Sequence, residues 1–359
     1  MVNFGFSPVS TDPVSYYYNI ENGLRMFRSV MAKLKAGQTI KPNVCCFGSS
    51  SLAGFGSTDN NILGFIGLLR SALATQFGDV GTGIITQDSF LISGSPLIVF
   101  TGTWSQLLSG KSSSSNGASF STSFNGTGVS LFAKQNTGYG SLSIVIDGGA
   151  PDVWSLNGTL DYNKIWTKTG LSAGDHTIVV TKTDANYTLF HGLLPIKGTA
   201  GININNFGIY GAYSTSYIPS GSGILDTTAK NFFLDYWAPV LSIICIGSND
   251  ASKTPSSIPL DQHEAALQSL ITACKVHGDV LLIAGGLRSE TSTIPISSYT
   301  AVQKQLAKPN NCAFIDMNTR WGNVYATANT TYGFYSDTVH PSNAGHQDYA
   351  SAISKAFDL

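Results

Sequence analysis

Charged side chains are scarce in this sequence of 359 residues. Asp, Glu, Lys and Arg make up 11% of it, against about 25% in an average soluble domain. The formal net charge is −1, so no positive surplus exists to neutralise phosphate groups, and we expect no nucleic-acid partner. Gly, Ser, Thr and Asn replace the charged residues. This composition is typical of turn-rich β structure and indicates an extracellular, cell-surface or virion-associated protein.

Other signals are missing as well. No apolar run approaches the roughly 20 residues needed to cross a bilayer, so no membrane span is expected. The first residues lack a basic stretch followed by an apolar one, so no signal peptide is expected. The five cysteines show neither C-x-x-C nor Cys/His spacing, and several lie in apolar runs. We therefore expect reduced cysteines and no metal site.

Both ends of the sequence alternate short apolar runs with segments of helical periodicity. This order predicts a parallel sheet with helices on both faces, an α/β fold. The predicted strands are 44–47, 241–247, 280–286 and 312–317, and the predicted helices are 22–36, 61–77, 261–278, 298–307 and 342–359.

The middle of the sequence has a different pattern. Between residues 93 and 200, short alternating or β-branched runs are separated by Gly, Asn and Ser turns, which favours a β-sandwich. We therefore predict one α/β domain interrupted by an insertion. The predicted division is an N-terminal helical lead over 1–40, a catalytic domain over 41–92 and 201–359, and an inserted sandwich over 93–200.

Four segments carry residue types that suit acyl transfer. A serine nucleophile needs a base, the base needs an orienting group, and the oxyanion needs donors. Ser50 lies in FGSSSLAG, a Gly-flanked turn between a predicted strand and helix. Asp337 and His340 are three residues apart before a proline, and Asn249 directly follows a predicted buried strand. Gly211 follows the short run FGIY, where a backbone amide can approach a substrate closely.

Each segment also has a simpler explanation when taken alone. Gly, Ser, Asn and Asp are common turn residues, and an exposed Asp and His in a loop are unremarkable. The remaining histidines, His176, His191, His263, His277 and His346, are expected to be structural or surface residues. Asp250 is expected to shape the turn beside Asn249.

The four segments together resemble the signature blocks of the SGNH (GDSL-like) hydrolase superfamily, in that family's order. Residues 48–54, GSSSLAG, are similar to its G-D-S-x-x-x-G block, with Ser49 in place of the usual Asp. Residues 247–250 match G-x-N-D, and 337–341 match D-x-x-H-P. The resemblance covers roughly 41–90 and 205–359. It implies a flavodoxin-like three-layer α/β sandwich that hydrolyses esters without a cofactor.

The resemblance also assigns roles. Ser50 is the nucleophile by register, because it stands two residues after Gly48 and four before Gly54. Asp337 and His340 complete its triad, and the oxyanion hole consists of Ser50, Gly211 and Asn249. Gly208 is the alternative source of the glycine amide.

The insertion suggests a substrate. Its sequence is similar to the jelly-roll modules of some polysaccharide-active enzymes, which favours O-deacetylation of a polysaccharide. A lipase or simple-ester hydrolase is one alternative, and an inactive carbohydrate-binding virion or surface protein is another. Aromatic residues of the insertion either offer flat faces to sugars or fill the sandwich core. They are Trp104, Tyr139, Trp154, Tyr162 and Trp166.

Overall fold

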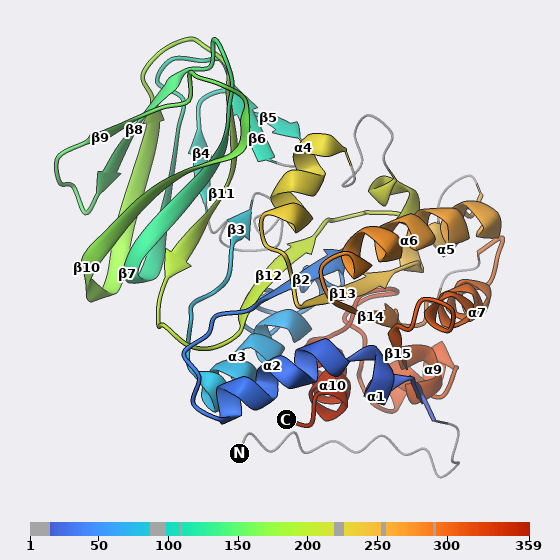
Figure 1. Ribbon diagram of the computed structural model, residues 1–359. Coiled ribbons are helices and arrows are strands. Elements are labelled where there is room, and N and C mark those ends of the chain that lie inside the picture. Colours follow the sequence, from blue (N-terminus) through green and yellow to red (C-terminus); the bar gives the residue numbers. More distant parts are fainter. Residues whose placement is uncertain (1–14, 87–97, 108–109, 219–225, 253–255, 290–291) are drawn as a thin grey trace.

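The computed structural model describes residues 15–86, 98–107, 110–218, 226–252, 256–289 and 292–359. It contains two sheets, of six and nine strands (Figure 1). The strands of the first are β1 (Tyr17–Tyr18), β2 (Asn43–Gly48), β12 (Asn203–Gly208), β13 (Leu241–Ile246), β14 (Asp279–Ala284) and β15 (Ala313–Asp316). No helix in these described ranges is both long and apolar enough to cross a membrane.

The first sheet has the order β1-β15-β14-β13-β2-β12. All its neighbouring pairs are parallel except β1 with β15, which is antiparallel. Without the short edge strand β1, the five parallel strands follow the flavodoxin-like order 2-1-3-4-5. The predicted fold class is therefore confirmed, with one antiparallel edge strand that the sequence did not indicate. The strand order reverses at β2, which lies between β12 and β13.

Helices cover both faces of this sheet, and the side chains of β2 show why. Val44 and Cys46 belong to one buried core, whereas Cys45 and Phe47 belong to the core on the opposite face, as expected for successive strand residues. The helices are α1 (Ile20–Gly23), α2 (Arg25–Lys35), α3 (Phe65–Phe77), α4 (Thr227–Lys230), α5 (Ser248–Ser252), α6 (Leu260–Lys275), α7 (Ile296–Ala307), α8 (Met317–Arg320), α9 (Tyr325–Thr330) and α10 (Asn343–Ala356), with short 3-10 and π turns at Ser214–Tyr217 and Asn231–Asp235.

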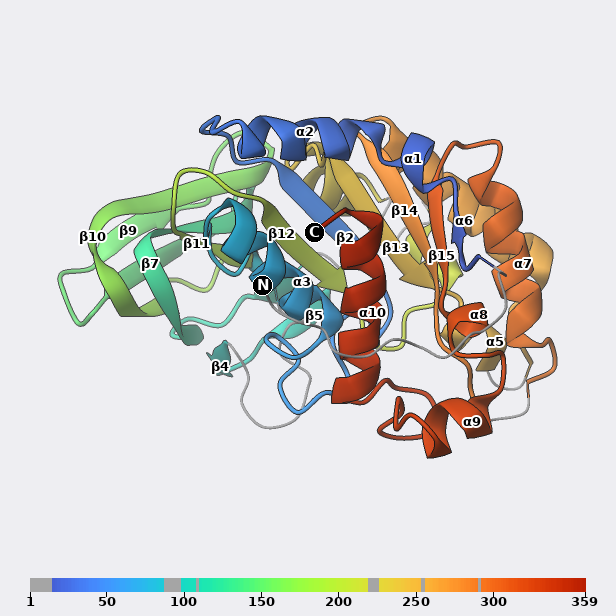
Figure 2. The same cartoon turned by 90° about the horizontal axis from the view of Figure 1, so that it is seen from below.

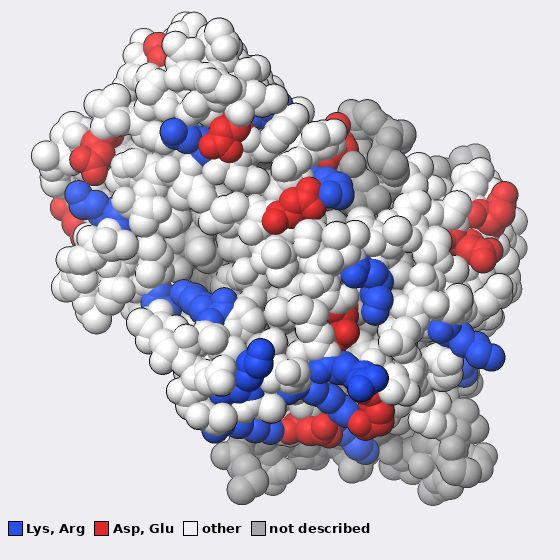
Figure 3. Space-filling view, in the orientation of Figure 1, with Lys and Arg blue, Asp and Glu red and all other residues white. Residues whose placement is uncertain are grey.

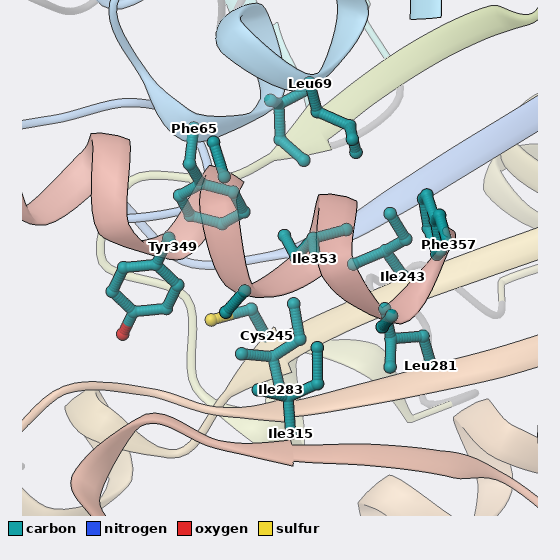
Figure 4. Packing of buried hydrophobic residues seen from close by; sticks show 14 of the residues in the cluster. Phe65, Leu69, Ile243, Cys245, Leu281, Ile283, Ile315, Tyr349, Ile353 and Phe357 are labelled. Atoms are coloured by element: carbon teal, nitrogen blue, oxygen red, sulfur yellow. The ribbon is translucent and has the colours of Figure 1, made fainter. Parts of the chain in front are cut away.

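One core joins α3 and α10 to the strands. Phe65 and Leu69 from α3 meet Ile353 from α10 above Ile243 and Ile283 of the sheet (Figure 4). Figure 2 shows α2, α3 and α10 lying across the same side of the strands.

The N-terminal helix, predicted within a helical lead over 1–40, packs on the α/β domain. Leu24, Phe27 and Met31 of α2 are buried in the core that also holds α10. Phe27 packs on Phe357 with ring centroids 4.6 Å apart. The amphipathic face of this helix therefore belongs to the α/β domain. Its outer surface carries Lys and Arg, which gather along the lower edge of the face shown in Figure 3.

The second sheet has the order β5-β6-β11-β7-β10-β8-β9, with β3 beside β11 and β4 beside β7. Its strands are β3 (Ile85–Thr86), β4 (Val99–Thr101), β5 (Ser105–Leu107), β6 (Gly110–Ser113), β7 (Ser119–Gln135), β8 (Ser141–Ile146), β9 (Asp152–Ser155), β10 (Asp161–Lys182) and β11 (Thr188–Ile196). The antiparallel sheet encloses its own apolar core, so the insertion is sandwich-like as predicted. The predicted start at residue 93 lies outside the described residues, but β3 already belongs to this sheet.

The inserted sheet packs directly on the α/β domain. In the first half of β7 alternate residues are buried, whereas residues 128–133 are all buried. Val129, Leu131 and Ala133 pack in the core of the inserted sheet. Phe132 belongs instead to the core of the α/β domain, where it contacts Phe232 and Trp237 at ring distances of 6.3 and 5.4 Å. The two parts therefore share a core residue.

We predict that Phe132→Ala lowers the free energy of unfolding by about 3–5 kcal/mol, the usual cost of removing a fully buried Phe. Urea unfolding followed by tryptophan fluorescence measures the change. Val179→Ala is the matched control, because Val179 is 41% exposed on β10, and we expect a change within about 0.5 kcal/mol. Equal small effects of both substitutions would show that Phe132 does not join the two parts.

Candidate active site

Three neighbouring strands, β12, β2 and β13, end at the same edge of the first sheet. Gly48 pairs with Gly208 on one side and with Cys245 on the other. Ser50 follows the end of β2 by two residues, and Gly211 and Asn249 follow the ends of β12 and β13 by three. This is the point where the strand order reverses, the usual ligand position in open α/β sheets. The fold therefore gathers these three residues at one edge.

Ser50 lies on a tight, buried turn. Its residue is 4% exposed, and its carbonyl accepts a hydrogen bond from the Phe55 amide at 2.9 Å. Gly56 brings this turn against the C-terminal loop. Its φ is +95°, and a Cβ there would lie 2.2 Å from the Pro341 carbonyl and 2.9 Å from the His340 Cβ. A glycine is therefore required for the two loops to meet.

The serine, the histidine and the carboxylate form a connected chain. Ser50 Oγ lies 2.9 Å from His340 Nε2, and His340 Nδ1 lies 2.7 Å from Asp337 Oδ2. Asp337 is acceptor-only when ionised, so Nδ1 carries the proton and Nε2 is left to accept from the serine hydroxyl. The structure thus brings together the three predicted residues in the geometry that a nucleophile and its base require.

Asp337 is held as a carboxylate. Burial alone raises the pKa of its carboxyl, but hydrogen bonds from the His340 amide, the His340 ring and the Val339 amide outweigh that effect and lower the pKa. Both amides donate to Oδ1 at 2.7 Å. Because Asp337 and His340 are three residues apart, the one Asp337 side chain binds both the backbone of the loop and the His340 ring.

Phe55 and His346 extend the contacts around His340. The Phe55 ring lies edge-on to the His340 ring, with centroids 4.2 Å apart. The Phe55 carbonyl is 3.0 Å from His346 Nε2, and the Phe65 amide donates to His346 Nδ1 at 3.3 Å. Burial lowers the pKa of His346 to about 4. His346 is therefore a neutral structural residue, as expected, although its link to the site had no signal in the sequence.

The backbone amides considered as oxyanion donors differ in whether they already have an acceptor. Within the described ranges the amides of Ser50 and Gly211 donate to no other group. The Gly208 amide instead donates to Asn206 Oδ1 at 3.0 Å, which favours Gly211 over Gly208. Gly211 has a φ of +72°, and open space surrounds its Cα on the side of a would-be Cβ.

Residues after β13 hold the loop that carries Gly211. Asn249 Nδ2 donates to the Ala212 carbonyl at 3.0 Å, which leaves its second N–H for an oxyanion. The Asp250 carboxylate is fully buried and accepts from the Ser214 amide at 3.0 Å and from the Ser214 hydroxyl. His263 Nδ1 contacts the same carboxylate at 3.0 Å. Asp250 therefore shapes more than its own turn, because it also fixes the glycine loop.

The other predicted features lie elsewhere. His176, His191 and His277 contact Asp147, the Tyr162 carbonyl and Asp235, respectively. All five cysteines are buried and form no disulfide. No group of three or more potential metal-ligating side chains is present in the part of the chain that the structure describes.

The aromatic residues of the insertion mostly pack its core. Trp154 is 5% exposed within that core, and Trp104, Tyr139 and Trp166 pack against it half-buried. Tyr162 lies beneath Lys134, whose Nζ is 5.1 Å from the ring centroid. Of the two possibilities that the sequence left open, core packing describes Trp154.

Two family sequence models match parts of the chain. The sequence model of the GDSL-like Lipase/Acylhydrolase family matches residues 180–347, and that of the Carbohydrate esterase 2 N-terminal domain matches residues 108–201. The first match contains Gly211, Asn249, Asp337 and His340. Ser50 lies outside it, before the insertion in the sequence. No curated protein sequence matches the chain.

Three solved structures are similar to this chain to different degrees. A peptidoglycan O-acetylesterase is 16% identical with a TM-score of 0.71, over 96% of this chain and 98% of that one. A two-domain esterase active on acetylated mannans is 14% identical with a TM-score of 0.47, over 96% and 55%. A family two carbohydrate esterase from Clostridium thermocellum, in complex with cellohexaose, is 16% identical with a TM-score of 0.33, over 72% and 97%. Of these three similarities, the first supports the fold.

We predict that stability falls between pH 6.5 and 4, partly through His346. Its pKa is about 6.5 when unfolded and about 4 when folded. The unfolded state therefore binds more protons in this window, so stability is lost as the pH falls. Substituting His346→Gln should reduce the difference in unfolding free energy between pH 7.5 and 4 by about 2–3 kcal/mol. Urea unfolding at both pH values measures it. A variant with the parent's full pH dependence would contradict the assignment.

Proposed function

Since the chain is an ester hydrolase that carries a GDSL-like lipase/acylhydrolase domain and a carbohydrate esterase 2 N-terminal domain, we propose that it removes O-acetyl groups from a polysaccharide through a Ser50–His340–Asp337 triad. The observation that carries the proposal is the 2.9 Å contact between Ser50 Oγ and His340 Nε2. A serine hydroxyl is a weak nucleophile unless a base within hydrogen-bond reach accepts its proton.

The reaction proceeds in two halves. His340 takes the Ser50 proton as Oγ attacks the ester carbonyl, and Asp337 stabilises the resulting imidazolium. Collapse of the tetrahedral intermediate breaks the bond to the alcohol oxygen, which receives the proton from His340. Water then attacks the acyl-enzyme with His340 again as base, which releases acetate and restores Ser50.

The negative charge that develops on the carbonyl oxygen needs fixed donors. We assign this role to the Ser50 and Gly211 amides and to the Asn249 side chain. Among the residues that the structure describes, the amides of Ser50 and Gly211 have no acceptor, and Asn249 keeps one N–H beyond its bond to Ala212. Donors that are already oriented stabilise the transition state without reorganisation at the moment of reaction.

The substrate proposal rests on the insertion. Residues 108–201 match the N-terminal domain of carbohydrate esterase 2, and the inserted sheet packs on the catalytic domain through Phe132. We therefore favour an acetylated glycan over a lipid. A polysaccharide substrate also fits the extracellular, cell-surface or virion-associated setting that the low charge content indicated.

Replacing the nucleophile tests the proposal directly. We predict that Ser50→Ala lowers kcat for p-nitrophenyl acetate by on the order of a thousand-fold or more, since the base then has no hydroxyl to activate. Ser51→Ala is the matched control, because it removes the adjacent hydroxyl and leaves the 50–340 contact intact. Acetate release from a panel of acetylated glycans then identifies the substrate. Hydrolysis that survives Ser50→Ala and fails with Ser51→Ala would reassign the nucleophile.

Removing the side-chain oxyanion donor gives a separate prediction. Asn249→Ala should lower kcat by about 100- to 1000-fold with a smaller change in KM, because the lost hydrogen bond forms mainly in the transition state. Steady-state kinetics with p-nitrophenyl acetate measure both constants, and circular dichroism checks that the fold is retained. An unchanged kcat would remove Asn249 from this role.

A further inference from the structure

Tyr210 is a large aromatic residue exposed next to the proposed oxyanion donor. Its side chain belongs to the loop after β12, directly before Gly211, and the residue is 52% exposed. Burial in a core does not account for a tyrosine at this position. Exposed aromatic side chains beside a reaction centre are common in ligand-binding sites.

The Tyr210 ring is linked to the catalytic histidine through one other ring. Tyr210 meets Phe55 edge-on with centroids 5.5 Å apart, and Phe55 meets His340 edge-on at 4.2 Å. Phe55 is half-buried, whereas Tyr210 extends outward. The two rings therefore form an aromatic wall, Phe55 and Tyr210, which runs from the base to the protein surface.

The direction of this wall identifies the part of the substrate that it meets. His340 delivers its proton to the departing alcohol oxygen, so the alcohol lies on the His340 side of the reacting carbon, and the acetyl methyl points elsewhere. The group beside Phe55 and Tyr210 is therefore the alcohol.

From this geometry we infer a pyranose-binding subsite at Tyr210, in which the sugar that bears the acetyl group lies against the aromatic wall. A pyranose presents a flat face of C–H bonds that fits an aromatic ring, whose face carries negative charge density. An acyclic alcohol lacks this face. The inference rests on the proposed function and specifies which half of the ester the enzyme recognises.

The backbone on both sides of Tyr210 is fixed. The Ile209 amide donates to the Gly48 carbonyl at 2.9 Å, and the Ala212 amide donates to the Ile209 carbonyl at 3.2 Å. Asn249 holds the Ala212 carbonyl at 3.0 Å. A ring presented on a rigid loop loses little conformational entropy when a ligand binds.

The test varies the alcohol while keeping the acyl group constant. We predict that Tyr210→Ala lowers kcat/KM for an O-acetylated methyl pyranoside by roughly ten-fold, as expected for the loss of one aromatic contact. The kcat/KM for ethyl acetate should change by less than about two-fold. Tyr210→Phe should retain the parent's preference, and Tyr210→Leu should not, because leucine is apolar without a flat face.

Controls separate this inference from the proposed function. Tyr236→Ala removes a second tyrosine, 41% exposed and in contact with Phe132 and Trp237, and should leave the ratio of the two substrates unchanged. Loss of Ser50-dependent hydrolysis of p-nitrophenyl acetate would refute the mechanism itself. If that hydrolysis is intact and Tyr210→Ala affects the pyranoside and ethyl acetate equally, the subsite is refuted alone.

Discussion

The hydrogen bond between Ser50 and His340 joins residues that are 290 positions apart, and the proposed chemistry depends on it. The parallel sheet supplies one side of this contact, because the turn that carries Ser50 follows its central strand β2. The C-terminal loop supplies the other side, where Asp337 binds both the His340 ring and the backbone around it. Gly56 then lets the two loops approach. A side chain there would collide with the Pro341 carbonyl and separate the base from the nucleophile.

The large insertion leaves this contact intact because of where it enters the fold. It lies between β2 and β12, yet these strands remain adjacent and in register from Asn43 to Gly48. The insertion therefore extends a crossover connection at the edge of the sheet and does not disturb the strand ends that carry the site. Phe132 gives it a defined contact with the α/β domain, which an insertion tethered only by its two linkers would lack.

The features that were predicted from sequence are local ones. Short apolar runs located the parallel strands, and the segments around Ser50, Asn249 and Asp337 carry their signals within a few residues. What could not be predicted depends on distant partners. No residue next to Asp250 in the sequence indicates that its carboxylate binds Ser214. Likewise, no residue next to His346 in the sequence indicates that its ring contacts the Phe55 carbonyl. On β9, alternation implies that Val153 and Trp154 face opposite ways, but it does not say which faces inward. The helix α2 was found from its apolar face, whereas its partner Phe357 is at the other end of the chain.

One short loop after β12 connects the two kinds of recognition that the enzyme needs. It carries the Gly211 amide, which in the proposed mechanism acts on the acyl oxygen, and the Tyr210 ring, which in the inferred subsite lies on the side of the alcohol. Asp250, which follows β13, holds the far end of this loop. A buried carboxylate is tolerated there because it accepts hydrogen bonds from the Ser214 amide and hydroxyl and contacts the His263 ring. These groups therefore hold the backbone of the loop, including the glycine amide, whereas the Tyr210 side chain extends from the loop and contacts Phe55. If both proposals hold, a change at Tyr210 alters the preference for the alcohol while the donors proposed to act on the acyl group stay in place.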